Sequence, residues 1–162
     1  MKFNSINLNN IKVINKENNF LDIKYNSGKL EFETPEMYLP FGLESNYGNY
    51  YLKLQFRKNK NDIVEFYNFI ELLEQKLREI IGTENLPSQI KTSDKYDPLL
   101  VTKLIKVKDN LVIDVFKDNQ NFNIYKLEKK NYVKAKLFLD NIWKKGDIYY
   151  YKIKVKEINI SC

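Results

Sequence analysis

Histidine is absent from this chain of 162 residues, and the only cysteine is Cys162. Without imidazole the chain lacks the commonest general base and the commonest metal ligand, and one thiol cannot build a zinc site or a Cys-His nucleophile pair. One cysteine also forms no intrachain disulfide, which is typical of proteins from reducing compartments. We therefore expect a protein that is not an enzyme, needs no metal or cofactor, and resides inside the cell, in the cytoplasm or the nucleus.

Glycine is scarce as well, with five residues that stand singly along the chain. The glycine-rich loops that cradle phosphates in nucleotide-binding proteins are therefore missing. The carboxylate–x–lysine pattern Asp22-Ile23-Lys24 has no aspartate ahead of it, which argues against a nuclease centre. No segment approaches the ~20 consecutive apolar residues that cross a bilayer, so we expect no membrane association.

Apolar side chains are plentiful: hydrophobic residues make up 43% of the chain and aromatic residues 14%, against 30% charged residues. This apolar share is too high for a disordered chain, and the length suffices to bury a core without disulfides or metal. We therefore expect one folded domain over residues 1–162.

The first third of the chain alternates polar and apolar residues with a period of two, over residues 11–14, 20–25 and 29–33. The turn signal Asn26-Ser27-Gly28 joins the last two runs, so we expect a β-hairpin or meander. Strict alternation returns at residues 49–57, which predicts a strand with one buried face and one wet face.

From residue 62 the apolar period becomes that of a helix, which we expect to span residues 62–81 with Asn61 as N-cap and Gly82 as stop signal. The polar connection 83–98 contains two prolines and is expected to be mobile. Further strands are expected at residues 101–107, 111–116, 122–127, 132–143 and 147–158. These elements predict an α+β fold, mainly β, in which roughly eight antiparallel strands form a partly open barrel covered by one long amphipathic helix.

Positive charge is concentrated near the end of the chain. Residues 129–156 contain nine lysines and two acids, which gives +7, so the other residues together carry −1 of the net charge of +6. An AT-rich genome would spread lysine along the whole chain, whereas this concentration indicates a basic surface that meets a polyanion.

Residues 132–158 are predicted to form a basic C-terminal hairpin, with lysines on one face and aliphatic side chains on the other. If both apolar faces point into the core, the loop must have an odd length. A loop at residues 144–146 places Lys136 opposite Lys154, and a loop one residue later fits the pattern as well. The sequence leaves both registers open.

Either register produces a lane of lysines edged by aromatic rings, and the strand at 49–57 repeats this pattern. Proteins that bind single-stranded nucleic acid combine such parts, because lysines follow the phosphates and aromatic faces stack on bases for ~1–3 kcal/mol per base. Lysines on an exposed sheet face also serve simply to prevent aggregation. The predicted nucleic-acid-binding residues are Tyr51, Lys53, Arg57, Tyr132, Lys134, Lys136, Phe138, Trp143, Lys144, Lys145, Tyr150, Lys152, Lys154 and Lys156.

The segment Thr34-Pro35-Glu36-Met37-Tyr38-Leu39-Pro40-Phe41-Gly42-Leu43, followed by Tyr51-Leu52-Lys53-Leu54, resembles a block in small proteins of large nucleocytoplasmic DNA viruses. The chain is similar there to the single-stranded-DNA-binding proteins of these viruses, which resemble OB-fold phage replication proteins in plan. The resemblance implies an OB-like barrel, sequence-tolerant binding of single-stranded nucleic acid with DNA favoured over RNA, and a role in replication or recombination within a host cell.

A second function class is a structural or assembly protein, such as a subunit of a virion or of another complex. Its apolar segment Met37–Leu43 and its exposed tyrosines would then contact a protein partner. A third class, an enzyme that works with carboxylates or a tyrosine, requires a pocket that holds carboxylates of perturbed acidity. The salt dependence of the binding affinity distinguishes the first two classes. Only binding to phosphates releases cations, and it therefore weakens steeply as the salt concentration rises.

Overall fold

The computed structural model describes residues 1–161, so Cys162 lies outside the described part of the chain. Within residues 1–161 there are one α-helix, three 3-10 helices and fifteen strands. The helices are η1 (Phe3–Ser5), η2 (Leu8–Asn10), α1 (Asn61–Ile81) and η3 (Ile124–Lys126). The first strands are β1 (Ile11–Glu17), β2 (Phe20–Tyr25), β3 (Leu30–Glu33), β4 (Met37–Leu39), β5 (Glu44–Asn46), β6 (Asn49–Gln55), β7 (Ile90–Lys91) and β8 (Leu99–Val107). The others are β9 (Asn110–Val112), β10 (Asp114–Lys117), β11 (Gln120–Asn121), β12 (Asn131–Leu139), β13 (Asn141–Lys145), β14 (Ile148–Tyr151) and β15 (Lys154–Ser161).

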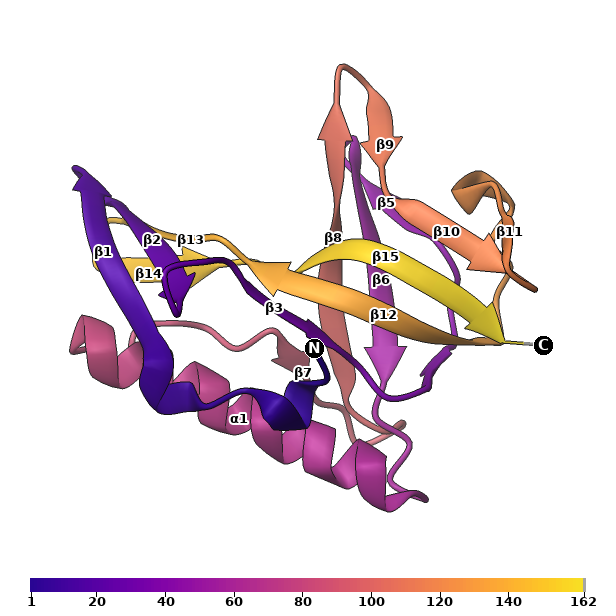
Figure 1. Cartoon of the computed structure of the whole chain (residues 1–162), viewed down its shortest axis with the longest axis horizontal. Helices are drawn as coiled ribbons and strands as arrows, with labels where there is room; N and C mark the ends of the chain where they lie inside the picture. The colour runs from indigo at the N-terminus through magenta and orange to yellow at the C-terminus, as the bar shows by residue number, and fades with distance from the viewer. Residues whose placement is uncertain (162) are drawn as a thin grey trace.

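Strands β4, β6, β8, β15 and β12 follow one another around an OB-like, partly open barrel, on the right of Figure 1. The order closes because β12 pairs with β4, and β3 extends the sheet beside β12. Two seams are narrow: the single pair Tyr38–Gln55 joins β4 to β6, and two residue pairs join β8 to β15. The pairings β8–β15 and β10–β15 are parallel, so the sheet is mixed, whereas the sequence predicts antiparallel strands.

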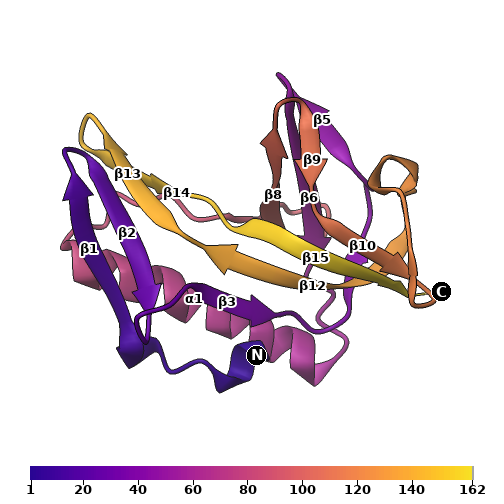
Figure 2. The same ribbon diagram turned by 45° about the horizontal axis from the view of Figure 1, so that its top comes forward.

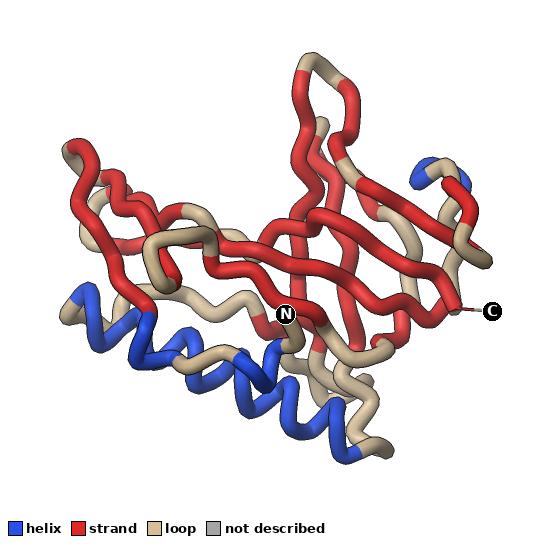
Figure 3. The backbone as a smooth tube through the Cα atoms, viewed as in Figure 1, coloured by secondary structure: helices blue, strands red, loops and turns tan. Residues whose placement is uncertain are grey.

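A second, four-stranded antiparallel sheet extends from the barrel and is called the wing below. It contains β1, β2, β13 and β14 in that order. The chain enters the wing from β12 and leaves it toward β15, and Asp140 separates β12 from β13. The wing lies on the left of Figures 1 and 2, away from the hairpins β5–β6 and β8–β9, and Figure 3 shows it above the C-terminal half of α1.

Helix α1 runs along the lower side of Figure 1, beneath both sheets, and matches the predicted helix at 62–81. Its N-cap is Lys60 instead of the predicted Asn61, and no side chain caps the first turn by a hydrogen bond. Gly82 ends the helix as predicted. Its φ of 77° is left-handed, which glycine adopts without strain, and its N–H donates to the Arg78 carbonyl at 2.9 Å.

Aromatic rings join the helix to the sheets. The ring centroids of Phe3 and Phe66 lie 5.0 Å apart, and those of Phe32 and Phe69 lie 5.1 Å apart. Phe56 approaches Phe66 from the barrel, with 5.8 Å between centroids. These rings belong to an apolar cluster that continues from the barrel into the wing. Full burial of one such ring contributes about 1.5–3 kcal/mol, so the cluster holds the two sheets together firmly.

The connection 83–98, predicted to be mobile, is anchored in its middle part. The buried carboxylate of Glu74 accepts hydrogen bonds from the Ser88 hydroxyl at 2.5 Å, the Gln89 backbone N–H at 2.8 Å and the Tyr151 hydroxyl. Burial, followed by the charge and the hydrogen bond of Glu74, raises the pKa of Tyr151 well above its ordinary value. These contacts tie α1, the connection and β14 to one another.

The predicted C-terminal hairpin at 132–158 is wrong. Strand β12 pairs with β15, while β13 and β14 form their own hairpin in the wing with a two-residue loop. The pairing places Lys136 opposite Glu157 instead of opposite another lysine. The apolar side chains of β15 change parity between Val155 and Ile158, and a β-bulge at this point keeps both of them in the core.

The strand predicted at 122–127 is also wrong, because this segment contains the 3-10 helix η3. The Asn123 side chain accepts a hydrogen bond from the Tyr125 backbone N–H at 3.0 Å and so caps the helix. Ile124 and Leu127 are both buried, a spacing of three residues that fits a 3-10 turn and not a strand.

Candidate nucleic-acid interface

The predicted binding residues are divided among three surfaces instead of one continuous lane. The outer face of β12 and β15 carries Tyr132, Lys134, Lys136, Phe138, Lys154 and Lys156. The outer face of β6 and β8 carries Tyr51 and Lys53; Arg57 follows β6, and Lys152 lies between β14 and β15, next to β8. The wing carries Trp143, Lys144, Lys145 and Tyr150.

Carboxylates compensate the lysines of β12 and β15. The ion pairs are Lys136 with Glu157 (3.5 Å), Lys154 with Asp140 (2.9 Å) and Lys156 with Glu31 (3.2 Å). A lysine whose charge is already matched attracts a phosphate less strongly. Phe138 is buried, with the Lys29 Nζ atom 5.0 Å from its ring centroid, so it exposes no free face to a base. The lane expected from the sequence is therefore interrupted on this surface.

Lys134 has an exposed side chain, but acidic residues surround it. It lines a groove of about 400 Å³ together with Glu33, Glu36, Asp62 and Glu65. Lys2 and Lys60 balance only part of that negative charge. This groove therefore does not favour a polyanion.

The outer face of β6 and β8 retains the aromatic and basic pattern. Antiparallel pairing places Tyr51 directly opposite Lys103. Lys53 stands two residues further along β6, where its Nζ atom lies 3.3 Å from Glu44 and 5.7 Å from the centroid of the Phe41 ring. The face thus combines the half-buried Tyr51 with Lys53, which is paired with a carboxylate, and Lys103, which forms no ion pair within residues 1–161.

Three lysines cluster beside this face without a carboxylate. No ion pair within residues 1–161 involves Lys91, Lys103 or Lys152. Burial lowers the pKa of Lys152, and the positive charges of Lys103 and Lys91 lower it further. Like charges that repel one another in this way are stabilised when an anion binds between them. The sequence prediction omits Lys91 and Lys103, although the alternation of residues 99–107 places Lys103 on the outer face.

An ordered arginine lies at the end of β6. The Arg57 guanidinium carbon is 3.4 Å from the centroid of the Tyr38 ring, its Nη1 donates to the Tyr132 hydroxyl at 3.0 Å, and its Nε donates to Gln55 at 3.1 Å. The Tyr38 and Tyr132 rings are 5.1 Å apart. An arginine held this way presents a planar face for stacking. The sequence prediction omits Tyr38, because its two flanking prolines suggest a loop where Met37–Leu39 forms β4.

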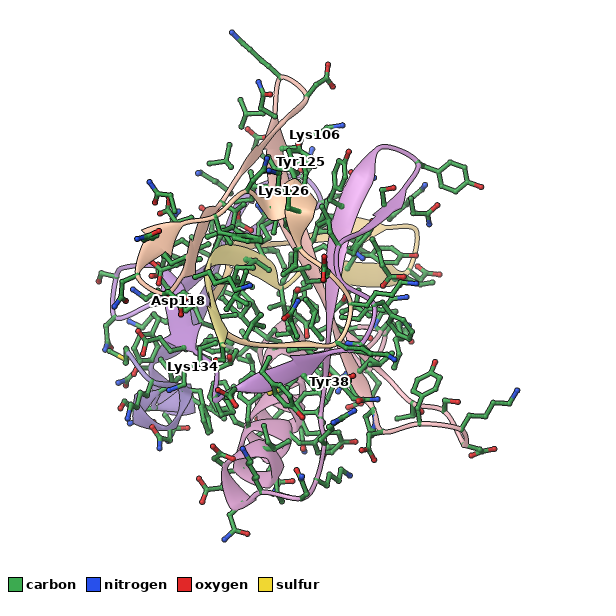
Figure 4. The ribbon with its side chains drawn as sticks, turned by 90° about the vertical axis from the view of Figure 1, so that its right-hand side faces the viewer. Tyr38, Lys106, Asp118, Tyr125, Lys126 and Lys134 are labelled. Carbon is green, nitrogen blue, oxygen red and sulfur yellow. The ribbon has the colours of Figure 1, made fainter. Side chains whose placement is uncertain are left out.

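Aromatic and basic side chains also gather at the hairpin ends beside this face. Tyr47, in the turn of β5–β6, is 98% exposed and has a left-handed φ of 49°. The Lys106 Nζ atom of β8 donates to the Gly48 carbonyl at 2.7 Å, and the Tyr50 and Tyr125 ring centroids are 6.0 Å apart. Figure 4 labels both Lys106 and Tyr125 at this end of the molecule.

The wing brings two of the predicted aromatic residues together. Trp143 of β13 lies opposite Tyr150 of β14, with 6.0 Å between ring centroids and 24° between ring planes. The Lys144 Nζ atom lies 5.5 Å from the Tyr149 ring centroid, and Lys145 is exposed next to the hairpin turn. These residues are near one another as predicted, but on a different sheet from the barrel lysines.

A groove of about 460 Å³ between α1 and residues 84–92 contains three carboxylates, Glu71, Glu74 and Glu84. Burial and the charges of Glu71 and Glu74 raise the pKa of Tyr67. The most deeply placed carboxylate, Glu74, is already satisfied by structural hydrogen bonds. Within residues 1–161 no three His, Cys, Asp or Glu side chains are grouped to hold a metal, and no helix is long and apolar enough to span a membrane.

No family model and no curated protein matches the chain. Solved structures of the single-stranded DNA-binding protein from bacteriophage Enc34 are similar to it in fold. The protein itself aligns with a TM-score of 0.54 and 13% identity over 91% of this chain and 88% of that chain. Its C-terminal truncation aligns with a TM-score of 0.54 and 12% identity over 93% of this chain and 92% of that chain. Its complex with ssDNA aligns with a TM-score of 0.56 and 11% identity over 93% of this chain and 94% of that chain. At this identity the similarity establishes the OB-like fold.

Proposed function

We propose that the chain binds single-stranded DNA, with little sequence preference, on the outer face of β6 and β8. The observation that carries this proposal is the uncompensated cluster of Lys91, Lys103 and Lys152 beside Tyr51. The lysines would contact phosphates and the tyrosine a base. Sequence tolerance follows because every nucleotide offers a phosphate and an aromatic face.

The order of the strands supports the choice of this face. The barrel has five strands, which in chain order are β4, β6, β8, β12 and β15. Around the barrel the fifth strand, β15, lies between the third and the fourth, so the spatial order is 1-2-3-5-4. OB folds bind oligonucleotides on the face of their second and third strands and with the loops between strands one and two and between strands four and five. The second and third strands of this chain are β6 and β8, and the two loops contain β5 and the hairpin β13–β14.

The cluster around Arg57 extends the proposed DNA-binding surface beyond the face of β6 and β8. Tyr38 lies opposite Gln55 of β6 on one side and opposite Tyr132 of β12 on the other, so the narrow seam between β4 and β6 connects the lysine face to this cluster. Arginine planes and tyrosine rings both stack on unpaired bases. We therefore include Arg57, Tyr38 and Tyr132 in the proposed interface.

One of the structural neighbours is a complex with ssDNA, which supports a single-stranded nucleic acid as the ligand, and we propose DNA. A role in replication or recombination inside the cell, without a cofactor, is the setting we propose for such a binding protein. The alternative of an assembly subunit finds less support, because Met37 and Leu39 of the apolar segment are fully buried and only Phe41 is 40% exposed there.

Fluorescence anisotropy of a labelled oligo-dT of ~30 nucleotides tests the proposal, with a duplex of equal length as the control. We expect tight binding at low salt, weaker binding at moderate salt and a clear preference for the single strand. The variant Lys103→Glu should lose about tenfold in affinity, whereas Lys76→Glu, the same change of charge on α1, should bind like the wild type. Absence of binding to oligo-dT at low salt would contradict the proposal.

A further inference from the structure

The wing presents a row of aromatic side chains on a surface separate from the proposed barrel face. Register places Tyr150 opposite Trp143 and Trp143 opposite Phe20, so the three residues stand side by side on three neighbouring strands. The alternate residues Ile142 and Tyr151 are buried on the side of α1. Because successive side chains of a strand point to opposite faces, the row faces away from the helix.

This row is accessible from outside. Phe20 is 41% exposed, and Trp143 and Tyr150 are half-buried. Two further apolar residues on the same face, Ile14 and Ile148, are 51% and 40% exposed. Exposed apolar side chains that are contiguous in this way mark a contact surface more often than isolated ones do.

The charges on the outer face of the wing favour a polyanion as the occupant. Lys12 of β1 lies directly opposite Lys24 of β2 on this outer face, an arrangement that costs stability. Neither lysine forms an ion pair within residues 1–161, whereas Asp22 of the same face is paired with Lys16 at 3.2 Å. A second copy of the chain docked face to face would bring these lysines together again, so charge disfavours it.

We propose that the outer face of the wing is a second stacking platform, on which bases of the bound strand stack against Tyr150, Trp143 and Phe20. A four-stranded sheet with aromatic residues on its open face stacks two or three unpaired bases in other nucleic-acid-binding proteins. Lys24 lies on the same face four residues further along β2 from Phe20, about 13 Å away, and Lys12 stands opposite it, so both can contact phosphates of a strand that continues across the sheet. This proposal rests on the proposed binding of single-stranded DNA and adds that the strand extends from the barrel onto the wing.

The fluorescence of Trp143 reports on this platform directly, because it is the only tryptophan of the chain. Unlabelled oligo-dT of ~30 nucleotides is titrated into the protein while anisotropy of a labelled copy is recorded in parallel. We expect Trp143 emission to be quenched and to saturate together with the anisotropy. Binding by anisotropy with unchanged Trp143 emission would overturn the platform and leave the barrel face standing, whereas no binding by either signal would overturn the proposed function itself.

A matched pair of variants completes the test. Phe20→Ser removes one ring of the row and retains Trp143, and we expect it to lower oligo-dT affinity at least about fivefold and to reduce the quenching. Leu72→Ser, at a position on α1 that is 55% exposed against 41% for Phe20, should behave like the wild type. Equal affinity and quenching in Phe20→Ser and wild type would overturn the proposal. Emission that changes with protein concentration in the absence of DNA would also overturn it, in favour of a second copy on this face.

Discussion

At Lys136 and Lys152 the same side chain has opposite surroundings. The Lys136 Nζ atom lies 3.5 Å from a carboxylate of Glu157, whereas burial and the positive charges of Lys103 and Lys91 lower the pKa of Lys152. Local sequence does not separate these cases, since both lysines come from the same basic stretch. What differs is the partner across the sheet, and that partner decides whether the cation is free to meet a phosphate.

Binding should depend on pH through Lys152. Its pKa is below the ordinary lysine value in the free protein, and a bound phosphate would raise it, so binding takes up a proton once Lys152 is partly neutral. We expect constant oligo-dT affinity at neutral pH and a decline in the alkaline range that begins below the ordinary lysine pKa of 10.5. Arginine stays charged throughout this range, so Lys152→Arg should shift the decline to higher pH. Identical anisotropy titrations of the two proteins across this range would contradict this role of Lys152.

Local pattern predicted the elements of the fold better than their pairing. The helical period and Gly82 were enough to place α1, and alternation placed β6 and β8, because these signals lie within each segment. Buried residues of a regular strand are separated by even numbers of positions, so the odd spacing of Val155 and Ile158 signals the bulge of β15 in the sequence. The prediction of one continuous hairpin overlooked this signal. The short strand β4 between two prolines gives no such signal, so the sequence did not reveal Tyr38 as part of the interface.

The junction of α1, the following connection and β14 depends on Glu74. Replacing Glu74 by alanine leaves the buried Tyr151 hydroxyl and the Gln89 N–H without their partner, and each unsatisfied group costs about 1–3 kcal/mol. We therefore expect Glu74→Ala to lower the free energy of unfolding by about 3 kcal/mol in urea denaturation. Glu71→Ala, at an exposed position of the same helix, should change it by less than about 0.5 kcal/mol. A similar stability for both variants would show that the junction is not held by these hydrogen bonds.

The whole molecule distributes its C-terminal lysines over two sheets. The segment 129–156 passes from the barrel into the wing and back, so residues that are close in sequence reach different surfaces. Non-local partners decide this arrangement: β13 pairs with β2, and β12 pairs with β3 and β4. A single sequence carries no direct signal for such pairings, which explains why the predicted residues were present but their predicted lane was not.

Two pairs of lysines from this arrangement allow a direct comparison by the salt dependence of oligo-dT affinity. Lys103→Ala combined with Lys152→Ala removes two uncompensated cations, whereas Lys136→Ala combined with Lys156→Ala removes two cations that carboxylates already match. Each lost phosphate contact lowers the slope of log affinity against log salt by ~0.7 for a single strand. We expect the first variant to lose ~1.4 from the slope and the second to keep the wild-type slope. An unchanged slope in the first variant, or a larger loss in the second, would contradict binding on the face of β6 and β8.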